Sequence, residues 1–305
     1  MIPEEDKIYN EDIITYLNRL PDRSVDLFIL DPPYYKVVND KWDNQWFTLE
    51  EYINWCDSWL KEVERVAKWS NSLWLFGFPH QLMHIFPLLQ KYGFAFRQQI
   101  VVNKGMQAVA GRTSNKLKMF PTATESIFYF YKDARDHLRD ILQSEKERLK
   151  WNGNNVNEHL GKATSGGGTF ACIASKKKPK EHRSYPTRED WIKLSEVMNL
   201  PKYEDVVYSF NIIKGLTDVW DDINFYDRSV KKIHSTQKPL ALIDRLVLSS
   251  SNEKNLVVDP FMGSGTTAIS CMNHNRRYSG CEIDKDYYEK ISVRIKKKLD
   301  IVSLF

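Results

Sequence analysis

The chain has 305 residues, of which 42% are hydrophobic and 13% aromatic, and it carries a formal net charge of +4. This is enough apolar material for a full core, so we expect one large domain or one domain with an insert. The sequence contains no run of about 18 apolar residues, which argues against a membrane span. Its first six residues, MIPEED, lack the basic start and apolar run of a signal peptide, so a cytoplasmic location is expected.

Cysteine and histidine usage argues against a metal site. The four cysteines are too sparse for a disulfide framework, and no CxxC pair suggests structural zinc. His80 and His84 have the i, i+4 spacing of a helical metal pair, but Gln81 stands where a zinc protease has glutamate. We interpret both histidines as polar residues of a surface helix and expect no metal.

The first 132 residues alternate between predicted strands and helices. The segment 25–30 is short, continuous and apolar, as in a buried strand. Thr48 and Glu51 have the spacing of a capping box at a helix start. The predicted strands are 25–30, 72–78, 94–103 and 126–132, and the predicted helices are 48–69 and 80–92. This alternation indicates an α/β sheet.

The pattern breaks after about residue 133. Segment 151–187 is rich in Asn, Gly, Ser and Lys and shows little periodicity, and a short helix is predicted at 187–198. We interpret residues 133–215 as an insert or second lobe. The basic cluster at 176–180 would suit contact with phosphates, although a solvated loop would look the same.

The α/β pattern returns in the last third of the chain. Helices are predicted at 239–249, 266–273 and 285–299, and strands at 255–258 and 277–281.

A glycine loop, DPFMGSG at 259–265, connects a predicted strand to a helix. Its two glycines allow the backbone close to a ligand, and the helix N-terminus offers free N–H groups. Glu282 ends the next strand, where an acid can accept hydrogen bonds from ribose hydroxyls.

Three kinds of ligand could bind at such a loop: a nucleoside triphosphate, a dinucleotide or S-adenosylmethionine. A nucleoside triphosphate site would need a lysine after Gly265, and a dinucleotide site a third glycine where Ala268 stands. Asp259 is unfavourable beside pyrophosphate but favourable beside an ammonium or a sulfonium, and S-adenosylmethionine carries both. A plain helix-capping turn is the alternative.

The strand at 25–30 ends in Asp31, Pro32, Pro33 and Tyr34. An exocyclic aromatic amine is a poor nucleophile because its lone pair is delocalised into the ring. The Asp31 carboxylate and the Pro32 carbonyl could accept its two hydrogens from a backbone that proline restrains. Tyr34 offers a flat face to a base turned out of its duplex. An ordinary strand end is the alternative.

Together these segments resemble the amino-methylating DNA methyltransferases, which use S-adenosylmethionine to methylate adenine N6 or cytosine N4. DPPY at 31–34 and DPFMGSG at 259–265 match two of their motifs, and HSTQKP at 234–239 resembles their HPTQKP segment. DPPY comes first and the glycine loop last, which is the permuted order of the β group.

This resemblance implies a Rossmann-like α/β fold with a circularly permuted, seven-stranded sheet, mostly parallel with one antiparallel strand. Residues 1–132 and 216–305 would form the catalytic and cofactor-binding domain, and residues 133–215 an inserted target-recognition region.

The resemblance also assigns roles to individual residues. Those for the target amine and base are Asp31, Pro32, Pro33 and Tyr34. Those for the cofactor are Asp259, Pro260, Phe261, Gly263, Gly265, Thr266, Glu282, Thr236, Gln237, Lys238 and, with a weaker match, Asp12. Contacts to double-stranded DNA are expected from the basic residues Lys176, Lys177, Lys178, Arg183 and Arg188.

The expected reaction is methylation of adenine N6 in double-stranded DNA, with base flipping, in a restriction–modification system. Adenine is favoured because cytosine-N4 members more often read SPPY. Cytosine-C5 chemistry is excluded, since none of the cysteines follows a proline. The alternatives are cytosine-N4 methylation, RNA or protein methylation, and a non-catalytic DNA-binding module. A homodimer and a separately encoded restriction endonuclease are compatible with the resemblance.

Overall fold

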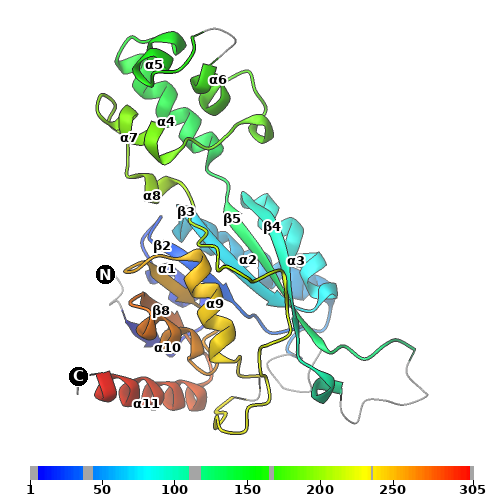
Figure 1. The fold of residues 1–305 in the computed structure, drawn as a ribbon. Coiled ribbons are helices and arrows are strands. Elements are labelled where there is room, and N and C mark those ends of the chain that lie inside the picture. Colours follow the sequence, from blue (N-terminus) through cyan, green and yellow to red (C-terminus); the bar gives the residue numbers. More distant parts are fainter. Residues whose placement is uncertain (1–5, 37–43, 110–117, 165–167, 235, 303–305) are drawn as a thin grey trace. The chain divides into compact units, whose positions relative to one another are not determined.

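The computed structural model describes residues 6–36, 44–109, 118–164, 168–234 and 236–302 (Figure 1). The chain divides into two compact units. The first unit consists of residues 1–67, 71–131 and 209–305, and the second of residues 68–70 and 132–208.

The first unit is built on one mixed sheet of eight strands, in the order β1-β8-β7-β2-β3-β5-β4-β6. Its strands are β1 (Lys7–Tyr9), β2 (Val25–Leu30), β3 (Ala67–Gly77), β4 (Phe94–Asn103), β5 (Thr124–Lys132), β6 (Val219–Trp220), β7 (Leu256–Asp259) and β8 (Arg277–Cys281). The parallel pairs are β2 with β3, β2 with β7, β7 with β8, β8 with β1 and β4 with β6. Strands β3 and β5 are antiparallel.

The expectation of seven strands is therefore wrong by one. No sequence pattern indicated β1 or β6, which have three and two residues. Strands this short cannot display the run or alternation by which a strand is recognised.

Helices cover both faces of the sheet, so the central strands are buried on both sides (Figure 1). The helices of this unit are α1 (Ile13–Arg19), α2 (Leu49–Val66), α3 (Pro79–Lys91), η2 (Met106–Val109), α9 (Leu240–Ser250), α10 (Thr266–Asn273) and α11 (Lys285–Val302). Phe28 and Leu30 of β2 pack in the cluster with α1, α2 and α3, whereas Leu27 and Ile29 pack with α9 and α10. This double burial explains why β2 is apolar at every position except Asp26, whose buried carboxylate accepts the Leu256 N–H at 2.8 Å.

Local capping explains where α2 begins. The Thr48 hydroxyl accepts the Glu51 N–H at 3.1 Å, and the Glu51 carboxylate accepts the Thr48 N–H at 3.5 Å. The predicted capping box is thus confirmed. The helix ends at Val66 rather than at 69, because residue 67 already begins β3.

The second unit is a small helical body around its own apolar core, which includes Leu138, Leu142, Phe170, Trp191 and Leu194. Its helices are α4 (Arg135–Arg148), α5 (Gly153–His159), α6 (Gly168–Ala174), η3 (Lys180–His182), α7 (Arg188–Ser195) and α8 (Tyr203–Val206). Only α7 was predicted. Helices α5 and α6 have seven residues each, too few to show an amphipathic repeat in a polar segment.

Within the described part of the chain, no helix is long and apolar enough to cross a membrane.

Candidate active site

A cavity of about 970 Å³ opens in the first unit, where β2, β7 and β8 end. Parallel strands place their carboxyl ends at one edge of a sheet, and loops at that edge form the binding crevice of open α/β folds. The segment 31–34 follows β2, the glycine loop follows β7, and Glu282 follows β8. The cavity is lined by every residue assigned to the target amine or to the cofactor except Gly265.

The two glycines of the loop have different surroundings. Both adopt left-handed backbone conformations, with φ of +54° at Gly263 and +74° at Gly265. A Cβ at Gly265 would lie 2.6 Å from Cγ2 of Ile291 in α11, whereas a Cβ at Gly263 would meet nothing closer than 3.7 Å. Gly265 therefore permits packing against α11, and Gly263 keeps space open beside the loop.

Helix α11 also holds the loop by a hydrogen bond. Arg294 donates from Nη1 to the Ser264 carbonyl at 2.7 Å. Sequence reasoning missed this contact, because the loop motif gives no indication of which later helix supports it.

Asp259 is a buried carboxylate whose partners are uncharged. Thr267 Oγ1 donates to it at 2.6 Å and the Phe261 N–H at 3.0 Å. Burial raises the pKa of Asp259 to about 7 against these two hydrogen bonds, and the charges of Asp31 and Glu282 add to the rise. Among the described residues, no basic side chain forms an ion pair with Asp259, so the carboxylate offers a position for a ligand cation.

Glu282 ties the glycine loop to the end of β8. Its carboxylate accepts the Gly263 N–H at 2.8 Å and the Asp284 N–H at 2.9 Å. Burial raises the pKa of this carboxyl, and these hydrogen bonds oppose the rise. A carboxylate has about four acceptor positions, so Glu282 retains capacity for ligand hydroxyls.

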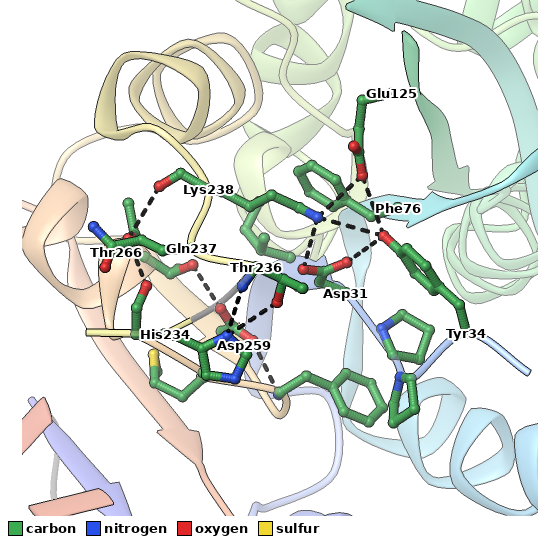
Figure 2. A pocket seen from close by; sticks show the side chains of 18 of the residues that line it. Asp31, Tyr34, Phe76, Glu125, His234, Thr236, Gln237, Lys238, Asp259 and Thr266 are labelled. Carbon is green, nitrogen blue, oxygen red and sulfur yellow. Dashed lines mark hydrogen bonds and ion pairs between the residues drawn. The ribbon is translucent and has the colours of Figure 1, made fainter. Parts of the chain in front are cut away.

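Asp31 belongs to a charged cluster on the cavity wall (Figure 2). The Tyr34 hydroxyl donates to Asp31 Oδ1 at 2.6 Å, and Lys238 Nζ lies 3.1 Å from Oδ2. Burial and the charges of Asp31 and Glu125 raise the pKa of Tyr34 well above its usual range. Lys238 was assigned to the cofactor, but in the structure its ammonium points to the side chains around Asp31 (Figure 2).

Glu125 and Lys104 complete this cluster, and the sequence analysis missed both. Glu125 lies 3.0 Å from Lys238 Nζ through Oε1 and 2.9 Å from Lys104 Nζ through Oε2. Burial alone would raise the pKa of Glu125, but the two lysines hold it at about 2. Glu125 lies near the start of β5, and β5 is antiparallel to β3, with Gly77 opposite Ser126. The start of β5 therefore reaches the edge where the parallel strands end.

The remaining cofactor assignments occupy the cavity wall with local partners. Thr236 Oγ1 lies 3.0 Å from His234 Nδ1, and Gln237 accepts the Ile233 N–H at 3.1 Å. Asp12 caps α1 by accepting the N–H groups of residues 14 and 15 at 2.9 and 3.1 Å. Ser235 of the HSTQKP segment lies outside the described residues.

The basic residues assigned to DNA lie in the second unit and differ in exposure. Lys176, Lys177 and Arg188 are exposed and Lys178 is half-buried. Arg183 is only 5% exposed and donates to Asp136 at 2.7 Å. Its guanidinium is thus part of the unit's own structure and is not presented to a partner.

The two histidines of the apparent metal pair contact each other edge to face, with ring centroids 5.0 Å apart. In the described ranges, no group of three or more His, Cys, Asp or Glu side chains could hold a metal ion.

Comparison with known families identifies the class. The model of the N6/N4 methyltransferase family, described as DNA methylase, matches residues 25–294. The chain therefore belongs to this family of DNA methylases.

Individual relatives agree with this placement. The chain is 25% identical to the type II methyltransferase M.HinfI of Haemophilus influenzae, covering 95% of this chain and 68% of that protein. It is 28% identical to the type II methyltransferase M.BglII of Bacillus subtilis, covering 93% and 67%.

Solved structures share the fold. A complex of M1.HpyAVI with S-adenosylmethionine (SAM) aligns with a TM-score of 0.54 at 18% identity, covering 94% of this chain and 98% of that one. The cytosine-N4-specific PvuII DNA methyltransferase aligns with a TM-score of 0.51 at 16% identity, covering 94% and 85%.

The titration of Asp259 gives a first prediction. Because its folded-state pKa is raised from 3.8 to about 7, this carboxyl contributes stability below about pH 4 that is lost as the pH rises through 7. Asp259→Asn lacks this titration. In the ligand-free protein, the melting temperature of the wild type should therefore fall relative to that of the variant between pH 5 and pH 8. The underlying change in unfolding free energy is roughly a few kcal/mol. Calorimetry measures both proteins, and a difference that does not vary with pH would contradict the burial argument.

Proposed function

We propose that this chain transfers a methyl group from SAM to the N6 amine of adenine in double-stranded DNA, with the base turned out of the duplex. One observation carries the proposal. The DPPY segment at 31–34 and the glycine loop at 259–265 follow two adjacent strands, β2 and β7, and residues of both line one cavity. An amine held by the first segment would therefore meet a methyl donor held by the second.

Three features of the cavity fit SAM. Asp259 supplies a buried carboxylate for a positively charged ligand, and Glu282 has acceptor capacity for ribose hydroxyls. Gly263 leaves open space beside the loop. When bound, SAM supplies a methyl group already activated by its sulfonium.

The chain's own residues position the target amine. The Asp31 carboxylate accepts one N–H and the Pro32 carbonyl the other, which favours positive charge developing on the nitrogen during attack. The Pro33 carbonyl accepts the Tyr52 hydroxyl at 3.0 Å, which braces the turn. Tyr34 presents its ring to the base.

The proton released by the methylated amine goes to Asp31 or to water. Burial would lower the pKa of Lys238, but Asp31 and Glu125 outweigh it and raise that pKa, so the lysine is already protonated. Glu125, with a pKa of about 2, is too weak a base to accept the proton.

Adenine is the proposed base because of Asp31, where cytosine-N4 members more often carry serine. Cytosine N4 is the second candidate, since the PvuII enzyme is cytosine-N4-specific and shares the fold. The relatives named type II methyltransferases support DNA as the substrate, and restriction–modification as the setting, over RNA or protein methylation. They also favour an enzyme over a binding module.

The domain proposal follows from the order of the motifs. Strand β7, near the C-terminus, lies between β8 and β2 within the sheet. This position supports a circularly permuted catalytic domain of residues 1–132 and 216–305. We assign target recognition to residues 133–215, with Lys176, Lys177, Lys178 and Arg188 as DNA contacts.

Asp31→Ala tests the role of the amine acceptor. The variant should lose at least about 100-fold in methyl incorporation into DNA, because the amine loses a charged acceptor in the transition state. Its affinity for SAM, measured by calorimetry, should change less than about threefold. Asp57→Ala is the control, since Asp57 pairs with Lys91 outside the cavity, and it should retain full activity. Retained turnover in Asp31→Ala would remove the proposed role.

Replacing Lys176, Lys177 and Lys178 together by glutamine tests the DNA contacts. Each lost phosphate contact should reduce the slope of log affinity against log salt concentration by about 0.9. A slope smaller by roughly 2 to 3 is therefore expected from fluorescence anisotropy with duplex DNA. The control replaces Lys296, Lys297 and Lys298 of α11, which is the same change of charge on another element. If both triple variants reduced the salt slope equally, the lysines would act by general electrostatic attraction to DNA and not by local phosphate contacts.

A further inference from the structure

The cluster around Asp31 contains a second carboxylate and two lysines, whereas accepting one N–H of an amine needs only the Asp31 carboxylate. It comprises the carboxylates of Asp31 and Glu125, the ammonium groups of Lys104 and Lys238, and the Tyr34 hydroxyl (Figure 2 shows all but Lys104). The side chains of Lys238 and Glu125 are only 12% and 9% exposed. Buried charges are costly unless they are paired, so the two acids and two lysines stabilise one another.

Asp31 is engaged before any target arrives. Tyr34 donates to its Oδ1 at 2.6 Å and Lys238 approaches its Oδ2 at 3.1 Å. A carboxylate held by an ammonium is a weaker acceptor for a further N–H, because its negative charge is already neutralised. The target amine therefore has to compete with Lys238 for Asp31.

Glu125 is a second acceptor for the two groups that donate to Asp31, the Tyr34 hydroxyl and the Lys238 ammonium. Its Oε1 lies 3.0 Å from Lys238 Nζ and 3.3 Å from the Tyr34 hydroxyl. Lys104 holds the other oxygen, Oε2, at 2.9 Å and so keeps Glu125 in place. Neither donor has to travel in order to exchange one carboxylate for the other.

We infer that Glu125 is a positioning residue for methyl transfer, which retains Lys238 and the Tyr34 hydroxyl while Asp31 turns to the target amine. The inference rests on the proposed function. In the step itself, the amine nitrogen forms a bond to the methyl carbon as the carbon–sulfur bond breaks and its electron pair stays on sulfur. The nitrogen then loses one proton to Asp31 or to water. Glu125 takes no part in these bonds and acts only by sharing the donors that Asp31 releases.

Glu125→Gln removes the charge and keeps the size. Asp31 is then the only carboxylate paired with Lys238 among the described residues, so the ammonium should hold it more tightly. We expect kcat to fall at least about tenfold, while the KM for DNA and the Kd for SAM change less than about threefold. Glu125→Asp keeps the charge and should lose less than the glutamine variant. Glu253→Gln, which neutralises an exposed acid outside the cavity, should leave kcat unchanged.

A double variant separates this role from a merely structural one. Replacing Lys238 by methionine in the Glu125→Gln background frees Asp31 from the ammonium, so kcat should rise above that of Glu125→Gln alone. A purely structural role predicts that the double variant is at least as slow as the glutamine variant, and that result would overturn the inference.

The other possible results of these experiments also test the inference. If Glu125→Gln unfolds below the assay temperature, Glu125→Asp is measured in its place: the shorter side chain withdraws the carboxylate from Lys238 and from the Tyr34 hydroxyl, so kcat should fall severalfold. An unchanged kcat in a folded Glu125→Gln, or in Glu125→Asp where only that variant folds, would overturn the inference and leave the proposed function intact. A wild type that binds SAM and methylates no DNA would contradict the proposed function itself.

Discussion

Strand β2 pairs in parallel with β7 through Leu27 opposite Val257 and Phe28 opposite Val258. This pairing joins two segments from opposite ends of the chain and brings their following loops to the same sheet edge. The pairs of β7 with β8 and of β2 with β3 extend that edge, so Glu282 arrives from one side and the start of β5 from the other. The cavity and its chemistry depend on the register in which β2 pairs with β7.

The charges of the cavity are distributed in two different ways. Around Asp31 and Glu125, two acids face two lysines, and the cluster is balanced within the protein. Within the described segments, the hydrogen-bond donors to Asp259 are neutral, and burial raises its pKa to about 7. A balanced cluster can orient a neutral amine without a permanent counter-ion, whereas an unbalanced carboxylate favours a cationic ligand. Under the proposed function, the two motifs would supply complementary environments for the acceptor and the donor of the methyl group.

Much of this site could be predicted from the sequence because its motifs lie directly at strand ends. Asp31 and Asp259 close or follow apolar segments, and Glu282 follows the strand predicted at 277–281, so their shared edge follows from a parallel sheet. Glu125 could not be found in this way, because it enters from the beginning of a strand that runs in the opposite direction. Lys238 was recognised as a motif residue, but its direction depends on the buried acids around it. The short strands and the seven-residue helices α5 and α6 escaped prediction because elements of that length cannot display a periodic apolar signal. Helix α4 carries Leu138 and Leu142 four residues apart, so its apolar face was present in the sequence and was missed.

The most direct test of the account is to identify the methylated base. Unmethylated genomic DNA would be incubated with the protein and labelled SAM, digested to nucleosides and analysed by mass spectrometry. The account predicts N6-methyladenine as the labelled product. N4-methylcytosine would contradict the assignment of adenine and preserve the mechanism at Asp31. The absence of any methylated nucleoside, from a protein that binds SAM, would contradict the central claim that the two motifs form one DNA methylation site.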